Sequence, residues 1–369
     1  MKLFRKYKAI CATMVVLVLC ACCSKEYEHH TPQEETQVPI TFGSTDVMTK
    51  GLDPLNYERI KSKRFALFAF TPDNQPYLEH RDVVYIEDKE HWRCSPSAYW
   101  PFETSLSFFA YAPYDTLRVN SPTDDVKDSY VHFLSEMAET GMPRLRFIPP
   151  TDVTFQPDFC VAVPCMDKTK DDQKIHLSFH HTLTRVNFYV NCKGENPNDY
   201  TYRVTNLLIR GVEGSNILTY VDNDEKPYKW DEVDPDITKT GVYKLSSSQS
   251  QLTESPLKFF DPQNNDNNNL EDAYTHINVM YNGRLYLLPQ KLTSSAEIEL
   301  TVSIYFGETL ISILPPYILK LPENVVWEDE KTISYLITVD LDSITQSEIS
   351  AKVMAWKESG NSHSAETLE

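Results

Sequence analysis

The stretch Ile333-Ser334-Tyr335-Leu336-Ile337-Thr338-Val339-Asp340-Leu341 carries the pattern that decides the fold class. Its odd-numbered side chains are all apolar, and successive side chains of a strand point to opposite faces of a sheet. The alternation therefore predicts a strand with one buried face. The same pattern recurs in residues 186–190 and 298–306, and the apolar runs 65–70 and 106–112 predict buried strands. Strands that recur at short intervals between turn signals predict an all-β protein with two β-sandwich domains.

The amino-acid composition favours a strand-rich protein, and the net charge excludes nucleic acid as a partner. The 369 residues include 21 Tyr and 17 Phe but only 10 Gly, a balance that favours strands over long helices. The formal net charge of -18 excludes nucleic acid as a partner, because phosphate binding needs a basic face. The turn-rich stretch 194–199, which contains Pro197, is the best domain boundary, so we expect domains at 37–193 and 198–358 and a tail at 359–369.

Two local signals interrupt the strand pattern. Ser121-Pro122 can cap a helix, and the apolar residues that follow have helical spacing, which predicts one short helix ending near Gly141. The spaced residues are Val126, Tyr130, Phe133, Leu134 and Met137. Asn282-Gly283 fits the two-residue turn of a β-hairpin, because both of its positions require a positive φ. At most one or two short helices are therefore expected.

The N-terminus is typical of an export signal. A basic start is followed by a short apolar run and by Leu19-Cys20-Ala21-Cys22, which predicts a lipoprotein signal at 1–21 with Cys22 lipidated. Cys20 is a poorer choice for the lipidated residue because bulky Leu19 precedes it, whereas Cys23 stays a possible choice. An ordinary secretory signal with incidental cysteines also stays an open alternative. Polar residues 22–36 form a tether, and the acyl chains would anchor the chain in the outer membrane, at the cell surface.

No motif for catalysis, cofactor binding or metal binding stands out, so we expect neither an enzyme nor a cofactor. His180 and His181 are neighbours on a strand and point to opposite faces, which disfavours a shared metal ion. The four cysteines of the globular part match no zinc spacing. The preferred interpretation of Cys160 is a buried free thiol. Whether any two of the four cysteines form a disulfide stays open. These cysteines are Cys94, Cys160, Cys165 and Cys192.

Several ordered stretches together resemble the fimbrillin family, the Mfa-like, type V pilin-like lipoproteins of Gram-negative anaerobes. These stretches cover nearly the whole chain after the signal. They are Tyr99-Trp100-Pro101, residues 106–113, residues 156–159, residues 177–186, Leu288-Pro289-Gln290, Trp327 with Tyr335, and Val353-Met354-Ala355-Trp356.

The resemblance implies two transthyretin-like Greek-key β-sandwich domains. It also implies that a trypsin-like protease cuts after the first strand, which leaves with the lipid and opens a groove for a C-terminal segment of the next subunit. On this sequence the displaced strand would hold Val38, Ile40 and Phe42, and the cut would follow Lys50, where many members have Arg. The donor would be 349–356 or the segment with Ile333, Tyr335, Ile337, Val339 and Leu341.

The expected function is therefore a structural or accessory subunit of a cell-surface fimbria, or pilus, that supports adhesion. Its partners would be other fimbrial subunits or copies of itself, and host or bacterial surface ligands. An unprocessed chain would keep its lipid and act as an anchor or a tethered accessory subunit. The alternative is a surface lipoprotein that does not polymerise and binds glycan or protein ligands.

Overall fold

The structure is a computed structural model that describes fourteen stretches of the chain. They are 37–47, 64–115, 130–134, 136–151, 153, 156–172, 175–195, 199–231, 240–245, 255–260, 273–277, 285–343, 347–355 and 366–368. Some predicted features lie outside these residues: the signal, Cys22, the tether, Lys50, Asn282-Gly283 and Trp356.

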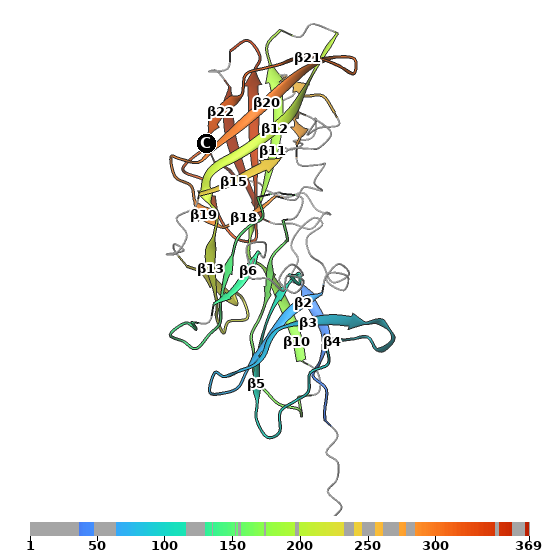
Figure 1. The fold of residues 1–369 in the computed structure, drawn as a ribbon. Coiled ribbons are helices and arrows are strands. Elements are labelled where there is room, and N and C mark those ends of the chain that lie inside the picture. Colours follow the sequence, from blue (N-terminus) through green and yellow to red (C-terminus); the bar gives the residue numbers. More distant parts are fainter. Residues whose placement is uncertain are drawn as a thin grey trace, which may run out of the picture. The chain divides into compact units, whose positions relative to one another are not determined.

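The described chain is all-β, as the alternating sequence pattern predicts (Figure 1). Its one complete helical element in these stretches is a 3-10 turn at Glu87–Lys89. None of the described residues builds a helix with the length and apolar character needed to cross a bilayer. Strand pairing between distant segments therefore carries the architecture.

One sheet of eight strands closes on itself. Its order is β2-β3-β4-β1-β10-β8-β5-β9, and β2 also pairs with β5, so the path from β2 to β5 returns to its start and forms a ring. A closed ring leaves no unpaired edge among its members. The strands are β1 (Thr41–Val47), β2 (Phe65–Phe70), β3 (Pro76–Ile86), β4 (His91–Ser95), β5 (Leu106–Ala112), β8 (Cys160–Ala162), β9 (Cys165–Lys168) and β10 (Ile175–His181).

Strand β2 shows why its sequence is apolar without alternation. All six of its side chains are buried. Phe65 and Leu67 join the core cluster that contains Phe42, whereas Ala66 and Phe68 join a second cluster on the other face. A strand covered on both faces has no position for a polar side chain, so the run stays apolar throughout.

A four-stranded sheet covers that second cluster, in the order β14-β13-β7-β6. Its apolar side chains, among them Leu145, Phe147 and Leu218, pack with Phe68 and Phe159. The strands are β6 (Val131–Leu134), β7 (Arg144–Phe147), β13 (Asn216–Tyr220) and β14 (Tyr228–Trp230).

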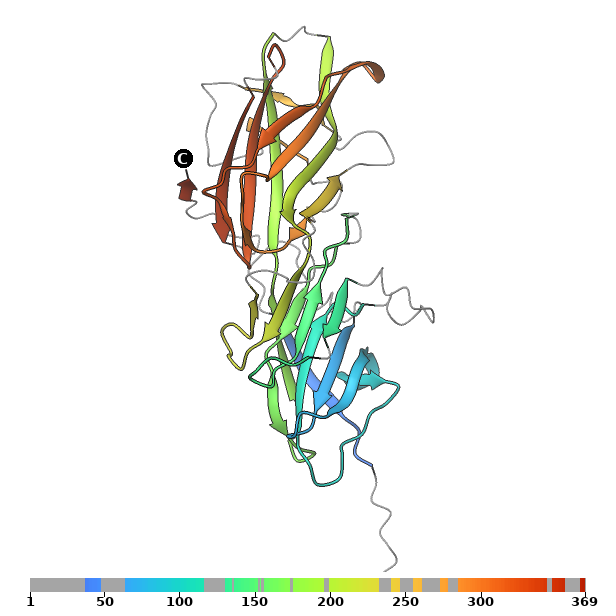
Figure 2. The ribbon, with the colours of Figure 1, turned by 60° about the vertical axis from the view of Figure 1, so that its left-hand side comes forward.

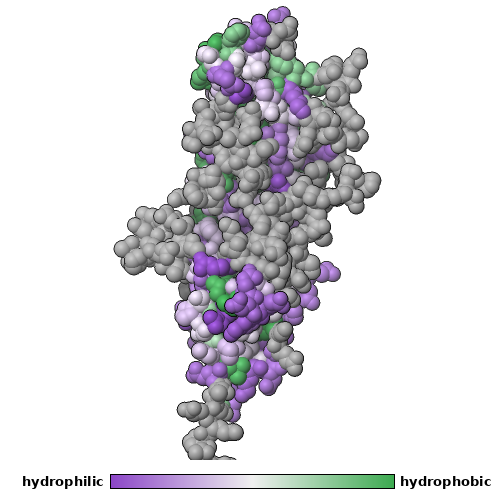
Figure 3. All heavy atoms as spheres, turned by 90° about the vertical axis from the view of Figure 1, so that its right-hand side faces the viewer, coloured by the Kyte–Doolittle hydropathy of each residue, from purple (hydrophilic) through white to green (hydrophobic). Residues whose placement is uncertain are grey.

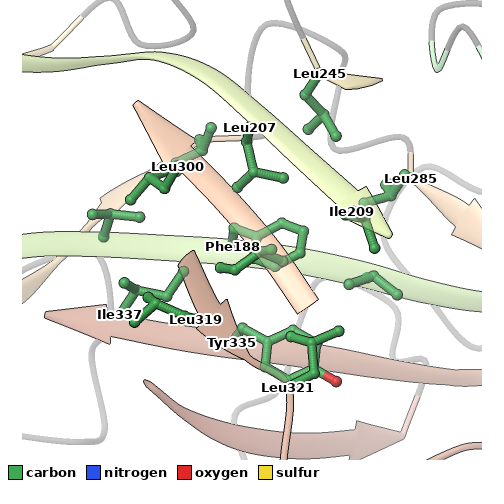
Figure 4. Close-up of a cluster of buried hydrophobic side chains, with 14 of the residues drawn as sticks. Phe188, Leu207, Ile209, Leu245, Leu285, Leu300, Leu319, Leu321, Tyr335 and Ile337 are labelled. Carbon is green, nitrogen blue, oxygen red and sulfur yellow. The ribbon is translucent and has the colours of Figure 1, made fainter. Parts of the chain in front are cut away.

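Two larger sheets enclose the third and largest cluster. Phe188 and Tyr335 of one sheet face Leu207 and Leu300 of the other (Figure 4). The seven-stranded sheet holds β11 (Thr184–Lys193), β16 (Lys258–Phe259), β17 (Thr275–His276), β18 (Tyr286–Leu287), β24 (Lys331–Asp340), β25 (Glu348–Ala355) and β26 (Glu366–Leu368). The five-stranded sheet holds β12 (Tyr200–Glu213), β15 (Thr240–Leu245), β20 (Glu297–Phe306), β21 (Thr309–Ile313) and β22 (Tyr317–Lys320). A short pair, β19 (Gln290–Lys291) and β23 (Val326–Trp327), completes the strands.

Strand β11 shares its core with strands that follow the predicted boundary. It pairs in parallel with β24 from Arg185 to Lys193 (Figures 1 and 2). The chain therefore passes from one cluster to the next near Leu183, which precedes β11, and not after residue 193. Residues Val38–Glu369 form one compact unit by their contacts, so the division into two domains and the Greek-key order stay predictions.

The predicted helix near Ser121–Gly141 is wrong over its described part. Residues Val131–Leu134 form β6, which pairs with β7. Val131 is buried in the second cluster, and the ring of Phe133 stacks on Phe68 with centroids 4.9 Å apart. Pairing and aromatic packing across the sheet override the helical spacing, since local propensity is a weak influence against tertiary contacts.

A buried hydrogen bond gives a stability test of the large core. The indole Nε1 of Trp327 donates to the hydroxyl of Tyr335 at 2.8 Å, and both side chains are buried. We expect Tyr335→Phe to lower the free energy of unfolding by about 1–3 kcal/mol, because it leaves a buried N–H without an acceptor. Urea unfolding measures this. The exposed control Tyr99→Phe should change it by less than about 0.5 kcal/mol, and equal losses in both variants would contradict the assignment.

A partly buried histidine gives a pH test. The His276 ring stacks on Tyr189 at 4.4 Å, and burial, aided by the positive charge of Arg185, lowers its pKa from 6.5 to about 4. Between these values the unfolded chain binds the proton more readily, so His276 should reduce stability as the pH falls from 6.5 towards 4. Urea midpoints at pH 7 and pH 4.5 should differ less for His276→Gln than for the wild type. An equal difference would show that His276 does not contribute.

Candidate functional site

Strand β1 joins two parts of the ring that are distant in sequence. It lies between β4 and β10 in the sheet order, antiparallel to β4 and parallel to β10. Phe42 is in register with Trp92 on one side and Ile175 on the other. The strand begins at Thr41 and runs to Val47, so it starts later and extends further than the predicted Val38–Phe42.

Two side chains anchor this N-terminal segment in the core. Ile40 and Phe42 are buried, whereas Val38 is 42% exposed. The Phe42 ring makes edge contacts with Phe65 at 6.1 Å and Phe108 at 5.6 Å between centroids.

Backbone hydrogen bonds hold the residues that immediately precede strand β1. The amide of Ile40 donates to the carbonyl of Ala98 at 2.8 Å, and the amide of Trp100 donates to the carbonyl of Val38 at 2.9 Å. The segment 38–42 is thus held by apolar burial and by backbone pairing together.

Removal of β1 would have a definite structural consequence. The ring would open between β4 and β10, and the backbone groups of these two strands that pair with β1 would lose their partners. The space left by Ile40 and Phe42 would expose the apolar side chains that surround them. An open edge beside an apolar slot is the arrangement that accepts an added strand.

The two candidate donor segments differ in their surroundings. Strand β24 lies between β11 and β25, and its side chains Ile333, Tyr335, Ile337 and Val339 are fully buried. Leu341 follows the strand and packs against the same cluster. Strand β25 lies one position nearer the edge of that sheet, where β26 pairs with it only from Ala351 to Val353.

A second surface with apolar character lies at β21. This strand pairs with β20, and all five of its residues are exposed. Green residues lie at the top of Figure 3, at the height at which Figure 1 places β21. The apolar residues exposed on and beside this edge are Phe306, Leu310, Ile311, Ile313 and Ile318.

A polar cluster lies where β8 begins and β10 ends. The ring atom Nδ1 of His181 contacts Asp158 Oδ1 at 2.8 Å and Cys160 Sγ at 3.2 Å. Burial lowers the pKa of His181, but the charge of Asp158 and its hydrogen bond outweigh this, and the pKa is raised. Burial, then the charge of Asp158, raises the pKa of the Cys160 thiol well above its ordinary value.

This cluster does not have the geometry of a cysteine nucleophile. A base that activates a thiol uses one ring nitrogen for the thiol and the other for the orienting carboxylate. Here both contacts go to Nδ1, and Cys160 is fully buried with its thiol protonated at neutral pH. The four cysteines of the globular part, Cys94, Cys160, Cys165 and Cys192, are all free thiols in the structure.

Sequence reasoning placed His180 and His181 on different faces but missed the cluster. His180 faces Glu330, with Nδ1 and Oε1 3.5 Å apart, whereas His181 contacts Asp158 and Cys160. Asp158 lies just two residues before Cys160, and this short spacing was a signal that the two side chains could lie close together. The pairing with β10 that brings His181 to them is visible only in the folded chain.

Comparison with known proteins agrees with the fold. A model of the fimbrillin-like family matches residues 61–356. A solved fimbrial protein from Bacteroides vulgatus has a TM-score of 0.57 and 18% identity, over 86% of this chain and 99% of its own. A candidate cell adhesion protein from Bacteroides uniformis has a TM-score of 0.44 and 14% identity, over 87% of this chain and 99% of its own. No curated protein matches the sequence. Since the family model spans most of the chain, this protein belongs to the fimbrillin-like family.

Proposed function

We propose that this protein is a structural subunit of a cell-surface fimbria, assembled by exchange of strand β1 for a strand of a neighbouring subunit. The observation that carries the proposal is the position of β1, which closes the ring between β4 and β10 and is the first described strand of the chain. Membership of the fimbrillin-like family supports a surface and adhesion role and a structural, non-enzymatic one.

The exchange rests on the physical demands of the gap. Loss of β1 leaves unpaired amides and carbonyls on β4 and β10 and an empty slot at Ile40 and Phe42. A buried backbone group without a partner is costly, so the opened ring gains free energy when it binds any strand that restores both the pairing and the apolar contacts. The partner is therefore a segment with alternating apolar side chains.

We propose that β25 supplies this strand. Its residues Ile349, Ala351 and Val353 alternate along one face, as Ile40 and Phe42 do in the segment they would replace. Withdrawal of β24 instead would remove the fully buried side chains at the centre of the largest cluster. Release of β25 leaves β11 and β24 paired and costs less of the core.

The sequence before β1 determines how the subunit would be presented. We propose that Cys22 carries the lipid that holds the exported chain at the outer membrane, and that cleavage after Lys50 separates the lipid and β1 from the rest. A chain that escapes cleavage keeps its anchor and serves as an anchoring or accessory subunit. The exposed apolar edge at β21 supports contact with other subunits or surface ligands, because such an edge is a site of association.

Limited proteolysis tests the exchange. We expect trypsin to release the segment that holds β1 from the lipid-bearing chain and to produce ladders of oligomers that resist SDS without heating. Lys50→Gln should abolish the ladders if cleavage at Lys50 opens the groove. Electrophoresis and mass spectrometry of the new N-terminus measure both results.

A matched variant sharpens this experiment. Arg59→Gln removes another trypsin site between β1 and β2 and should leave the ladders intact. If only Arg59→Gln loses the ladders, the proposed cleavage site at Lys50 is wrong, but the proposal of strand exchange still holds. A clipped chain that releases β1 and stays monomeric would contradict the exchange and favour a binding protein that does not polymerise.

The anchoring of β1 can be tested without proteolysis. Phe42 is 1% exposed and packs between Phe65 and Phe108, so we expect Phe42→Ala to reduce the free energy of unfolding by about 3–5 kcal/mol. Val38→Ala, at a position 42% exposed, should change it by less than about 0.5 kcal/mol. Urea unfolding of the uncleaved chain measures both. Similar effects at the two positions would show that Phe42 does not hold the strand.

A further inference from the structure

The cluster of Asp158, Cys160 and His181 is assembled by strand register. Cys160 is the first residue of β8, and Asp158 lies two residues before it, with its Oδ1 3.9 Å from the Cys160 sulfur. His181 is the register partner of Cys160 on the antiparallel strand β10. Pairing of two adjacent strands of the ring therefore brings the sulfur and the nitrogen together, and the residues just before β8 add the oxygen.

The separations of these atoms match the size of a metal ion. His181 Nδ1 lies 2.8 Å from Asp158 Oδ1 and 3.2 Å from Cys160 Sγ, and the sulfur lies 3.9 Å from that oxygen. These three distances form an acute triangle, and the point equidistant from its corners is about 2.0 Å from each. Zinc binds nitrogen and carboxylate oxygen at about 2.0–2.2 Å and sulfur at about 2.3 Å. A zinc ion slightly out of the plane reaches all three atoms, and rotation of the Asp158 and His181 side chains would widen the narrow N–Zn–O angle that the 2.8 Å contact gives.

The donor set and its charge favour zinc over calcium or magnesium. Imidazole and thiolate suit zinc, whereas calcium and magnesium prefer oxygen ligands throughout. A thiolate and a carboxylate carry two negative charges and a neutral imidazole none, so a divalent ion makes the site neutral. Neutrality matters here because His181 and Cys160 are 2% and 0% exposed, and an uncompensated charge is costly at such positions.

We propose that Asp158, Cys160 and His181 form a zinc site with three protein ligands and one open position. On binding, the Cys160 thiol loses its proton to solvent, and zinc occupies Nδ1 of a neutral His181 imidazole whose proton is on Nε2.

A zinc ion bound here would stabilise the segment through which the chain leaves the ring. Immediately after His181, the amide of Thr182 donates to the carbonyl of Phe159 at 3.1 Å, and Leu183 then leads into β11. The carbonyl of His181 accepts a hydrogen bond from the Tyr228 hydroxyl at 2.8 Å. A metal ion bound to β8 and β10 would therefore stabilise the segment from which the chain leaves the ring for the large core.

Metal titration of the full chain in detergent tests this site. We expect one equivalent of Zn²⁺ per chain, and with Co²⁺ a charge-transfer absorption that reports a metal–thiolate bond. Cys160→Ser should abolish that band and weaken Zn²⁺ binding at least about tenfold. Zn²⁺ should raise the Tm of the wild type and leave that of Cys160→Ser unchanged, because a ligand stabilises only the state that binds it.

The matched control is Cys165→Ser, which removes another free thiol of the same sheet and keeps Cys22, Cys23, His29 and His30 of the tether unchanged. It should bind the metal as the wild type does. Binding that survives Cys160→Ser, or is lost equally in Cys165→Ser, would place the metal elsewhere and overturn the proposal. Absence of stoichiometric binding to the folded wild type would also overturn it and leave the cluster as a hydrogen-bonded structural feature.

Discussion

Backbone pairing around the ring β2-β3-β4-β1-β10-β8-β5 is the constraint on which the first half of the protein depends. Each of these strands has a neighbour on both sides, so no edge remains open while β1 is in place. This strand carries Phe42 into the core, and Ile40, the residue just before the strand, is buried as well. Pairing and apolar burial therefore depend on the same short segment near the N-terminus.

This dependence makes β1 different from the other buried strands. Strand β2 is covered on both faces, and β24 is paired on both sides in the middle of the largest cluster, so neither can leave without loss of a core. Strand β1 comes first among the described strands, and it ends where the segment with Lys50 begins. A cut in that segment would separate β1 from the remaining strands and leave their chain continuous.

The zinc proposal and the strand-exchange proposal concern different parts of the same ring. Zinc would bind at β8 and β10, through Asp158, Cys160 and His181, whereas exchange would take place between β4 and β10. Strand β10 belongs to both, since it pairs with β1 on one side and β8 on the other. A metal ion that holds β10 to β8 would keep one wall of the groove in position when β1 leaves.

The sequence by itself determined the strand content and many of the buried positions. Alternation in 333–341 and 298–306 identified β24 and β20, and the apolar runs 65–70 and 106–112 identified β2 and β5, because side-chain direction along a strand follows from local geometry alone. The same local reasoning failed at 131–134, where packing against Phe68 and pairing with β7 replaced the expected helix.

Pairing partners were decided by the tertiary structure. Nothing local in 184–193 shows that β11 lies beside β24, that β2 meets β5 to close the ring, or that His181 meets Cys160. These pairs join segments far apart in sequence, and their register depends on which apolar faces the whole chain can bury together. The sequence therefore determined which residues form strands and which of their faces are apolar. Only the folded chain decided the neighbours of each strand, and with them the closing position of β1 and the cluster at Asp158.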